Sequence, residues 1–155
     1  MDIRDICEYI IDHISDNISA NQIAEAFHYD KSYLMRKFKE YTGFTISEFI
    51  NECRIYNSTN PLIYTDDSIL KIALNNGFNS LEYYSEKFKD IIGSSPMRFR
   101  QVYSGLLEVA YNSSDVEELN YVKAALAELQ DYQAYLYDIG SKCEKPKVKI
   151  LKGNN

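Results

Sequence analysis

Basic side chains gather in one short stretch of this acidic chain. Residues 31–39 contain four bases and no acid, namely Lys31, Arg36, Lys37 and Lys39. Ammonium and guanidinium groups bind phosphates, and an arginine can also donate two parallel hydrogen bonds to O6 and N7 of guanine. The chemistry that this stretch supports is therefore recognition of a nucleic acid.

The same stretch returns fifty residues later. The Phe-Lys pair and the glycine of residues 34–44 fall in the same places in residues 84–94. Upstream, each copy has an Ile-Ala pair followed four residues later by a turn position, His28 in the first copy and Gly77 in the second. A repeated helix, turn, helix unit of this size is too small to be an enzyme twice over, and it indicates one recognition unit used twice.

The charge of the whole chain opposes general nucleic-acid binding. The formal net charge is −6 and the pI is about 4.9, whereas such binding draws most of its affinity from Lys and Arg on phosphates. Much of the acid lies in the first helix and in the C-terminal third. Because salt screens exposed charges beyond roughly 8 Å, a local basic patch can act against the global sign.

Composition excludes several other classes of protein. The 155 residues correspond to about one domain, and no apolar run approaches the roughly 20 residues of a membrane span, so a cytoplasmic protein is expected. The three cysteines are odd in number and far apart, and the two histidines lack ligand spacing. We expect no disulfide, no metal, no cofactor and no enzyme activity.

Periodicity and capping signals predict helices throughout. Apolar residues at helical spacing predict an amphipathic helix over residues 2–15. Pro61 is expected to end or kink a linker helix, about residues 46–60, a little early because its ring clashes with the carbonyl four residues back. Helix starts are predicted at Asp30, at Ser95-Pro96 and at three capping boxes, residues 19–22, 45–48 and 114–117.

Residues 23–55 and 68–100 together resemble the paired helix-turn-helix DNA-binding domain of the AraC/XylS family of bacterial transcription activators. The likeness covers about residues 3–105. It is most specific in the second copy, where an IA, a GF, an FK, a glycine, an SP and a final Phe-Arg pair follow one another. The resemblance implies an all-α, homeodomain-like fold. The implied parts are a first subdomain (1–44), a linker helix (45–62) and a second subdomain (63–111), together the DNA-binding domain 1–111.

The resemblance implies that the two recognition helices enter successive major grooves on one face of double-stranded DNA. One monomer would read an asymmetric site and assist RNA polymerase, as in the short members of the family that lack a sensor domain. The positions that read bases are implied to be Ser32, Met35, Arg36, Leu81, Glu82, Ser85 and Glu86. The lysines suited to phosphates are Lys31, Lys37, Lys39, Lys87 and Lys89.

The second copy departs from the family pattern. A basic residue is usual where Glu86 stands. Glu82, Glu86 and Asp90 against Lys87 and Lys89 give residues 80–90 a net charge of −1. A carboxylate can accept from cytosine N4 but repels phosphates, so we expect the first unit to supply most of the affinity. Ser58 and Pro61 replace the usual Ala and Leu of the linker, which bears on the separation of the two units.

A C-terminal segment lies outside the resemblance. Residues 112–140 are expected to form a helix with a seam at spacings of three and four, made of Leu119, Val122, Leu126, Leu129, Gln133 and Leu136. Two arrangements stay open, packing on the domain or pairing in a homodimer. The basic tail, 141–155, could contact DNA phosphates or be disordered.

Two functions remain in view. The first is a sequence-specific transcription regulator, more specifically an activator. The alternative is a co-regulator with weakened DNA binding that acts by pairing with another regulator or with RNA polymerase, which the acidic charge and Glu82 and Glu86 favour.

Overall fold

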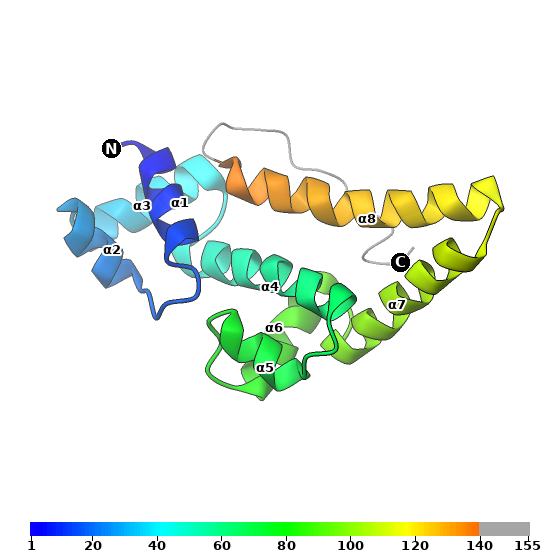
Figure 1. Cartoon of the computed structure of the whole chain (residues 1–155). Helices are drawn as coiled ribbons and strands as arrows, with labels where there is room; N and C mark the ends of the chain where they lie inside the picture. The colour runs from blue at the N-terminus through cyan, green and yellow to red at the C-terminus, as the bar shows by residue number, and fades with distance from the viewer. Residues whose placement is uncertain (140–155) are drawn as a thin grey trace.

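The computed structural model describes residues 1–139, which fold into α-helices with no strand in that range (Figure 1). The predicted all-α class is confirmed, and the basic tail lies outside the described residues. The helices are α1 (Ile3–Asp12), α2 (Ala20–Phe27), α3 (Lys31–Thr42), α4 (Ile46–Tyr64), α5 (Ile69–Asn75), α6 (Leu81–Ile92), α7 (Pro96–Asn112) and α8 (Val116–Tyr137).

Helices α2 and α3 form one helix-turn-helix motif, and α5 and α6 form a second. The turn positions expected at His28 and Gly77 both have a left-handed backbone, with φ of 57° and 86°. Each second helix also ends on a left-handed glycine, Gly43 after α3 and Gly93 after α6. Glycine adopts this conformation without a Cβ penalty, so the repeat in sequence is a repeat in backbone geometry.

Helix α4 joins the two motifs and lies at the centre of the molecule (Figure 1). Phe38 of α3 packs edge-on against Phe49 of α4 at 5.6 Å between ring centroids, and Phe88 of α6 packs in the same way against Phe99 of α7 at 5.3 Å. All four rings are buried. Each unit therefore uses the same aromatic pair to hold its recognition helix against the helix that follows.

The expectation that Pro61 ends the linker helix early is wrong, because α4 continues to Tyr64 with Pro61 inside it. The proline removes one backbone donor, but the last turn has other partners. Thr65 N–H and Thr65 Oγ1 donate to the Pro61 carbonyl at 3.1 and 2.6 Å, and Arg100 Nε of α7 donates to the Leu62 carbonyl at 2.9 Å. Burial of Leu62 and Ile63 adds to these bonds.

Two helix boundaries also differ from the predictions. Helix α1 ends at Asp12 and not near residue 15, because the His13 N–H closes the helix on the Tyr9 and Ile10 carbonyls. Helix α8 begins behind Asp115, whose carboxylate accepts from the Glu117 and Glu118 N–H groups. A carboxylate competes well with a hydroxyl at an N-cap, so Ser114 is not the cap. The capping box at residues 19–22 forms with both of its hydrogen bonds.

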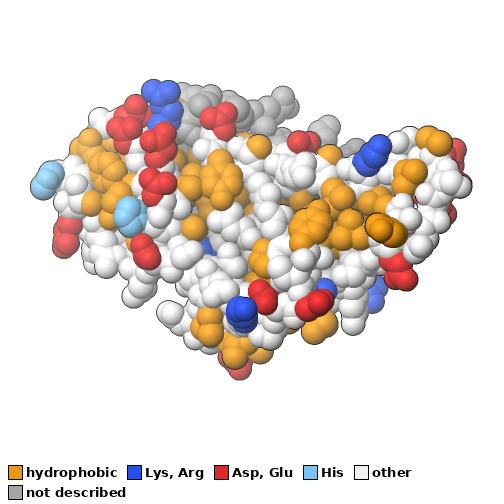
Figure 2. Space-filling view, viewed as in Figure 1, with side chains coloured by type: hydrophobic (Ala, Val, Ile, Leu, Met, Phe, Trp, Pro, Cys, Tyr) orange, Lys and Arg blue, Asp and Glu red, His pale blue; other side chains and the backbone are white. Residues whose placement is uncertain are grey.

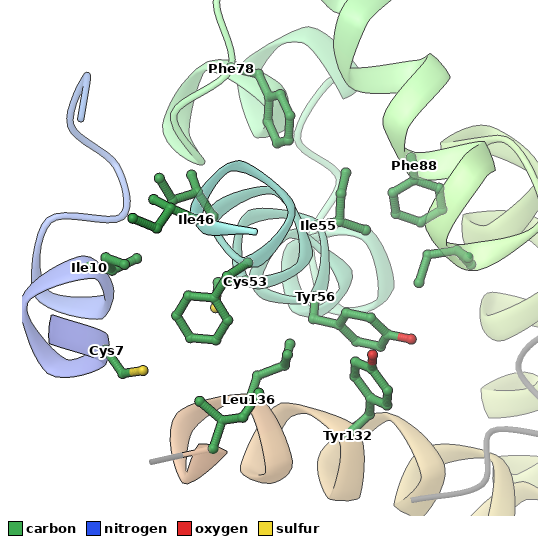
Figure 3. Packing of buried hydrophobic residues seen from close by; sticks show 14 of the residues in the cluster. Cys7, Ile10, Ile46, Cys53, Ile55, Tyr56, Phe78, Phe88, Tyr132 and Leu136 are labelled. Atoms are coloured by element: carbon green, nitrogen blue, oxygen red, sulfur yellow. The ribbon is translucent and has the colours of Figure 1, made fainter. Parts of the chain in front are cut away.

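Helix α8 folds back along α4, and Figure 3 shows Tyr132 and Leu136 of α8 directed at Tyr56 and Cys53 of α4. The Tyr56 and Tyr132 rings stack at 4.3 Å. Gln133 Nε2 donates to the Tyr56 carbonyl at 2.7 Å. Of the seam residues, Val122, Leu129 and Leu136 are buried and Leu119, Leu126 and Gln133 are half-buried. The seam thus packs within its own chain, one of the two arrangements that the sequence left open.

Cys7 and Cys53 are free and buried. Burial raises the pKa of the Cys7 thiol to about 12 and also raises the pKa of Cys53, so both thiols stay protonated at neutral pH. Between residues 1 and 139 the structure contains no group of three or more His, Cys, Asp or Glu side chains placed to hold a metal ion. Over the same residues, no helix has the length and apolar character to cross a membrane.

Candidate nucleic-acid interface

Helix α3 buries one face and presents the other to solvent. Leu34, Phe38 and Thr42 are buried against the core. The Asp30 carboxylate caps the helix by accepting from the Tyr33 N–H at 3.0 Å. The exposed residues of α3 include Lys31, Ser32, Met35, Arg36 and Lys39, and also Tyr33 and Glu40. The structure therefore leaves the expected base readers of the first unit open to solvent.

Helix α6 repeats this arrangement fifty residues later. Tyr84, Phe88 and Ile92 are buried at the positions equivalent to Leu34, Phe38 and Thr42. The hydroxyl of Ser80 caps the helix by accepting from the Tyr83 N–H at 3.1 Å. The expected base readers again share the outer side, with Leu81, Glu82 and Glu86 exposed and Ser85 half-exposed.

The flanking lysines are repeated as well. Lys37 and Lys87 are half-exposed. Each lies near a carboxylate one turn later in its helix, Glu40 at 3.3 Å and Asp90 at 3.9 Å. Each also lies over a tyrosine ring of its own helix, at 5.9 Å and 5.6 Å from the ring centroid. Lys39 and Lys89 are exposed without such an ion pair among the described residues, so their charges are open to a ligand.

The two exposed faces differ in charge. Lys31 and Arg36 on α3 are matched by Leu81 and Glu86 on α6. Ser32 is matched by Glu82. The face of α3 is therefore positive and the face of α6 is negative, although the two backbones and the two buried faces are alike.

Ser58 connects the linker helix to the second recognition helix. Its side chain is fully buried, and its Oγ accepts from the Tyr84 hydroxyl of α6 at 2.8 Å. Burial raises the pKa of Tyr84 to about 12, against a smaller lowering by this hydrogen bond. The departure from the family pattern at Ser58 is thus a polar contact that orients α6 on α4.

Two arginines that the sequence did not single out for this role join helices within the two units. Arg54 of α4 donates through Nε to the Ile14 carbonyl at 2.8 Å and through a terminal nitrogen to the Asp16 carbonyl at 2.6 Å. Arg100 of α7 does the same for the end of α4, at Leu62 and Thr65. In each unit an arginine from the last helix holds the end of the first. The Phe99-Arg100 pair that ends the family pattern was the one signal in the sequence for such an arginine. It points to Arg100 and not to Arg54.

Two helix-turn-helix motifs, each with its second helix exposed and both held on one central helix, define a DNA-binding class of fold. Comparison with known proteins agrees. The profile of a family described as "Helix-turn-helix domain" matches residues 23–102, just over half of the 155 residues. The chain belongs to the AraC-type family of helix-turn-helix transcriptional regulators.

Similar proteins are known from several bacteria. An uncharacterized HTH-type transcriptional regulator of Staphylococcus aureus is 34% identical over 98 residues, which are 63% of this chain and 13% of that protein. The bifunctional transcriptional activator/DNA repair enzyme AdaA of Bacillus subtilis is 30% identical over 109 residues, 70% of this chain and 51% of AdaA. The chain thus spans well under two thirds of the length of these relatives.

Solved structures show the same fold. The C-terminal domain of AraT, a response regulator from Geobacillus stearothermophilus, superposes with a TM-score of 0.63 at 27% identity, covering 64% of this chain and 84% of that one. The DNA-binding domain of AdpA, solved in complex with a target DNA, superposes with a TM-score of 0.64 at 20% identity, covering 67% and 94%. About two thirds of the chain therefore have the fold of known DNA-binding domains.

Proposed function

We propose that this protein is a transcription activator that binds one asymmetric site on double-stranded DNA, with α3 in one major groove and α6 in the next. The observation that carries the proposal is the matched exposure of the two recognition helices at the same fifty-residue spacing. Ser32, Met35 and Arg36 read bases in the first groove, and Leu81, Glu82, Ser85 and Glu86 read bases in the second.

The length of the linker supports binding to successive grooves. Helix α4 has 19 residues, which at 1.5 Å per residue is about 28 Å. Major-groove segments one helical turn apart are about 34 Å from each other. Both recognition helices pack directly on this rod, so a single chain spans such a site without a partner.

The phosphate contacts come from Lys31, Lys37 and Lys39 on α3 and from Lys87 and Lys89 on α6. Because Glu82 and Glu86 repel phosphates, the first unit supplies most of the affinity. The protein acts in the bacterial cytoplasm, where its DNA and RNA polymerase are present. A homodimer through Leu119, Val122, Leu126, Leu129, Gln133 and Leu136 would require α8 to leave α4, so we propose that the monomer is the binding form.

The experiment is selection of sites from random double-stranded DNA with purified full-length protein at two salt concentrations. The expected result is one asymmetric sequence protected over two adjacent major grooves, with affinity falling steeply as salt rises. Failure to enrich any sequence, together with stable capture of another regulator or of RNA polymerase, would instead support the co-regulator function. Transcription in vitro from a promoter that carries the selected site should rise when the protein is added, and a fall would show repression.

A further inference from the structure

A hollow lies between the two recognition helices, and apart from Met35 none of its lining residues has a role in the binding proposed above. Its volume is about 480 Å³, and it is lined by parts of α2, α3, α4 and α6. Met35 comes from α3 and Tyr83 from α6. The α4 side chains Ser47, Asn51 and Arg54 lie between them, at the helical spacing that places residues on one face. No residue of α8 is among those lining it, so α8 does not fill this space.

No carboxylate among residues 1–139 lines this hollow. Among the described residues that line it, Arg54 is charged and there is no Asp or Glu. A second hollow of about 220 Å³ shares Arg54 and Tyr83 and continues toward Asn79 and Ser80 at the start of α6, again without a carboxylate. The chain carries 23 Asp and Glu residues, and Figure 2 shows several of them over α1. Within the part of the chain that the structure describes, the lining between the two recognition helices lacks a carboxylate, so it is a surface on which an anionic polymer can lie.

Tyr83 presents a hydrogen-bond donor to the hollow. Asn51 Nδ2 donates to the Tyr83 hydroxyl oxygen at 3.2 Å, across 32 residues of sequence. Within residues 1–139 that hydroxyl accepts this bond and donates none to the protein. A tyrosine hydroxyl has one hydrogen to donate, and a phosphate oxygen is a strong acceptor for it.

We propose that the hollow receives the sugar-phosphate backbone of the DNA between the two major grooves, with the Tyr83 hydroxyl donating to a phosphate oxygen. On one face of a duplex, successive major grooves are separated by the minor groove and the two backbones that border it. The protein surface between α3 and α6 faces those backbones. Asn51 is a positioning residue, because its amide holds the hydroxyl oxygen and leaves the hydrogen for the ligand. This inference rests on the proposed binding to two successive grooves.

The repeat supplies a matched control for Tyr83. Tyr33 occupies the equivalent position on α3 and has a similar exposed fraction, 39% against 44%. It lines a different hollow, between α1 and α3, together with the acid Glu40. Tyr83→Phe and Tyr33→Phe each remove one hydroxyl and keep the ring, so both variants retain the fold. Circular dichroism melting of both proteins checks this.

The test measures affinity by fluorescence anisotropy for the site that the wild-type protein selects. Tyr83→Phe should weaken binding about tenfold, the size of one hydrogen bond to a charged group, while Tyr33→Phe should change it less than about twofold. Because the lost hydroxyl carries no charge, the dependence of affinity on salt should be unchanged. Equal effects of the two variants, or no effect of either, would overturn the inference. If the wild-type protein selects no site, the proposed function itself fails.

Neutral methylphosphonate linkages, placed one at a time in the DNA between the two grooves, locate the acceptor. One of them should weaken wild-type binding and have no further effect on Tyr83→Phe, since the same bond is already lost. Asn51→Ala should likewise weaken wild-type binding and add nothing in the Tyr83→Phe background. The losses of affinity could instead add, either for Tyr83→Phe with the methylphosphonate or for Tyr83→Phe with Asn51→Ala. Additive losses would show that Tyr83 and the phosphate do not interact and would overturn the proposal.

Discussion

Helices α3 and α6 are built on the same frame and carry opposite charge. The buried positions match at a spacing of fifty residues, as do the end glycines, the capped first turns and the lysine ion pairs. The exposed positions proposed to read bases do not match, since Arg36 corresponds to Glu86 and Ser32 to Glu82. Packing against α4 and α7 constrains the first set, whereas nothing in the fold constrains the second. The difference shows that the core keeps two helix-turn-helix units alike while the exposed faces of their second helices differ in charge.

Truncation of the equivalent core rings should destabilise the two helix-turn-helix units by similar amounts. Phe38→Ala and Phe88→Ala should each lower the free energy of unfolding by about 3–5 kcal/mol, because each ring is fully buried in an aromatic pair. Urea unfolding followed by circular dichroism measures this. Tyr111→Ala, at a side chain that is 93% exposed, is the control and should stay within about 0.5 kcal/mol. A cost below about 1 kcal/mol for either phenylalanine would contradict the equivalence.

The two turns should respond differently to substitution. A Cβ on Gly77 would lie 2.8 Å from Arg54 Nε and from the Ile14 carbonyl, in a left-handed backbone, so Gly77→Ala should cost about 2 kcal/mol or more of stability. His28 already holds a left-handed turn with a side chain, so His28→Gly should change stability by less than about 1 kcal/mol. Thermal unfolding of both variants tests the contrast, and equal costs would refute it.

Removing one charged side chain from each recognition helix should change the affinity for DNA by different amounts. Arg36→Ala should weaken binding to the selected site by about 1–3 kcal/mol, because a bidentate contact to guanine is lost. Glu86→Ala should have a smaller effect, since removal of the acid also relieves repulsion of phosphates. Anisotropy titrations at two salt concentrations measure both. A larger loss from the Glu86 substitution would show that α6, and not α3, dominates the affinity.

Removal of the repeated ion pairs should have the smallest effects on stability and on DNA binding. Glu40→Gln and Asp90→Asn should each change stability by less than about 0.5 kcal/mol, because the pairs with Lys37 and Lys87 are on the surface. Both substitutions should strengthen DNA binding by a similar small factor, since each releases a lysine for phosphates. If one substitution strengthened DNA binding and the other weakened it, one of these lysines would not face DNA.

Local signals in the sequence predicted several features of the structure, although the capping box expected at residues 114–117 does not form. Asp30 and Ser95 cap helices as predicted, through bonds to a residue three positions ahead, and turns occur at His28 and Gly77 as predicted from the repeat. Prediction from the sequence failed at Pro61, because the helix there is held by Arg100 from another element. It also missed Arg54, whose partners lie 38 and 40 residues away.

The sequence by itself determined the two repeated motifs, the buried phenylalanines and the opposite charges of α3 and α6. These features depend on residues within one or two helical turns of each other. Only the tertiary structure decided where α8 lies, since Gln133 and Tyr56 are 77 residues apart and the seam could equally have met a second chain. Only the tertiary structure likewise forms the hollow between α3 and α6. Asn51 and Tyr83 become partners only after α4 and α6 have packed.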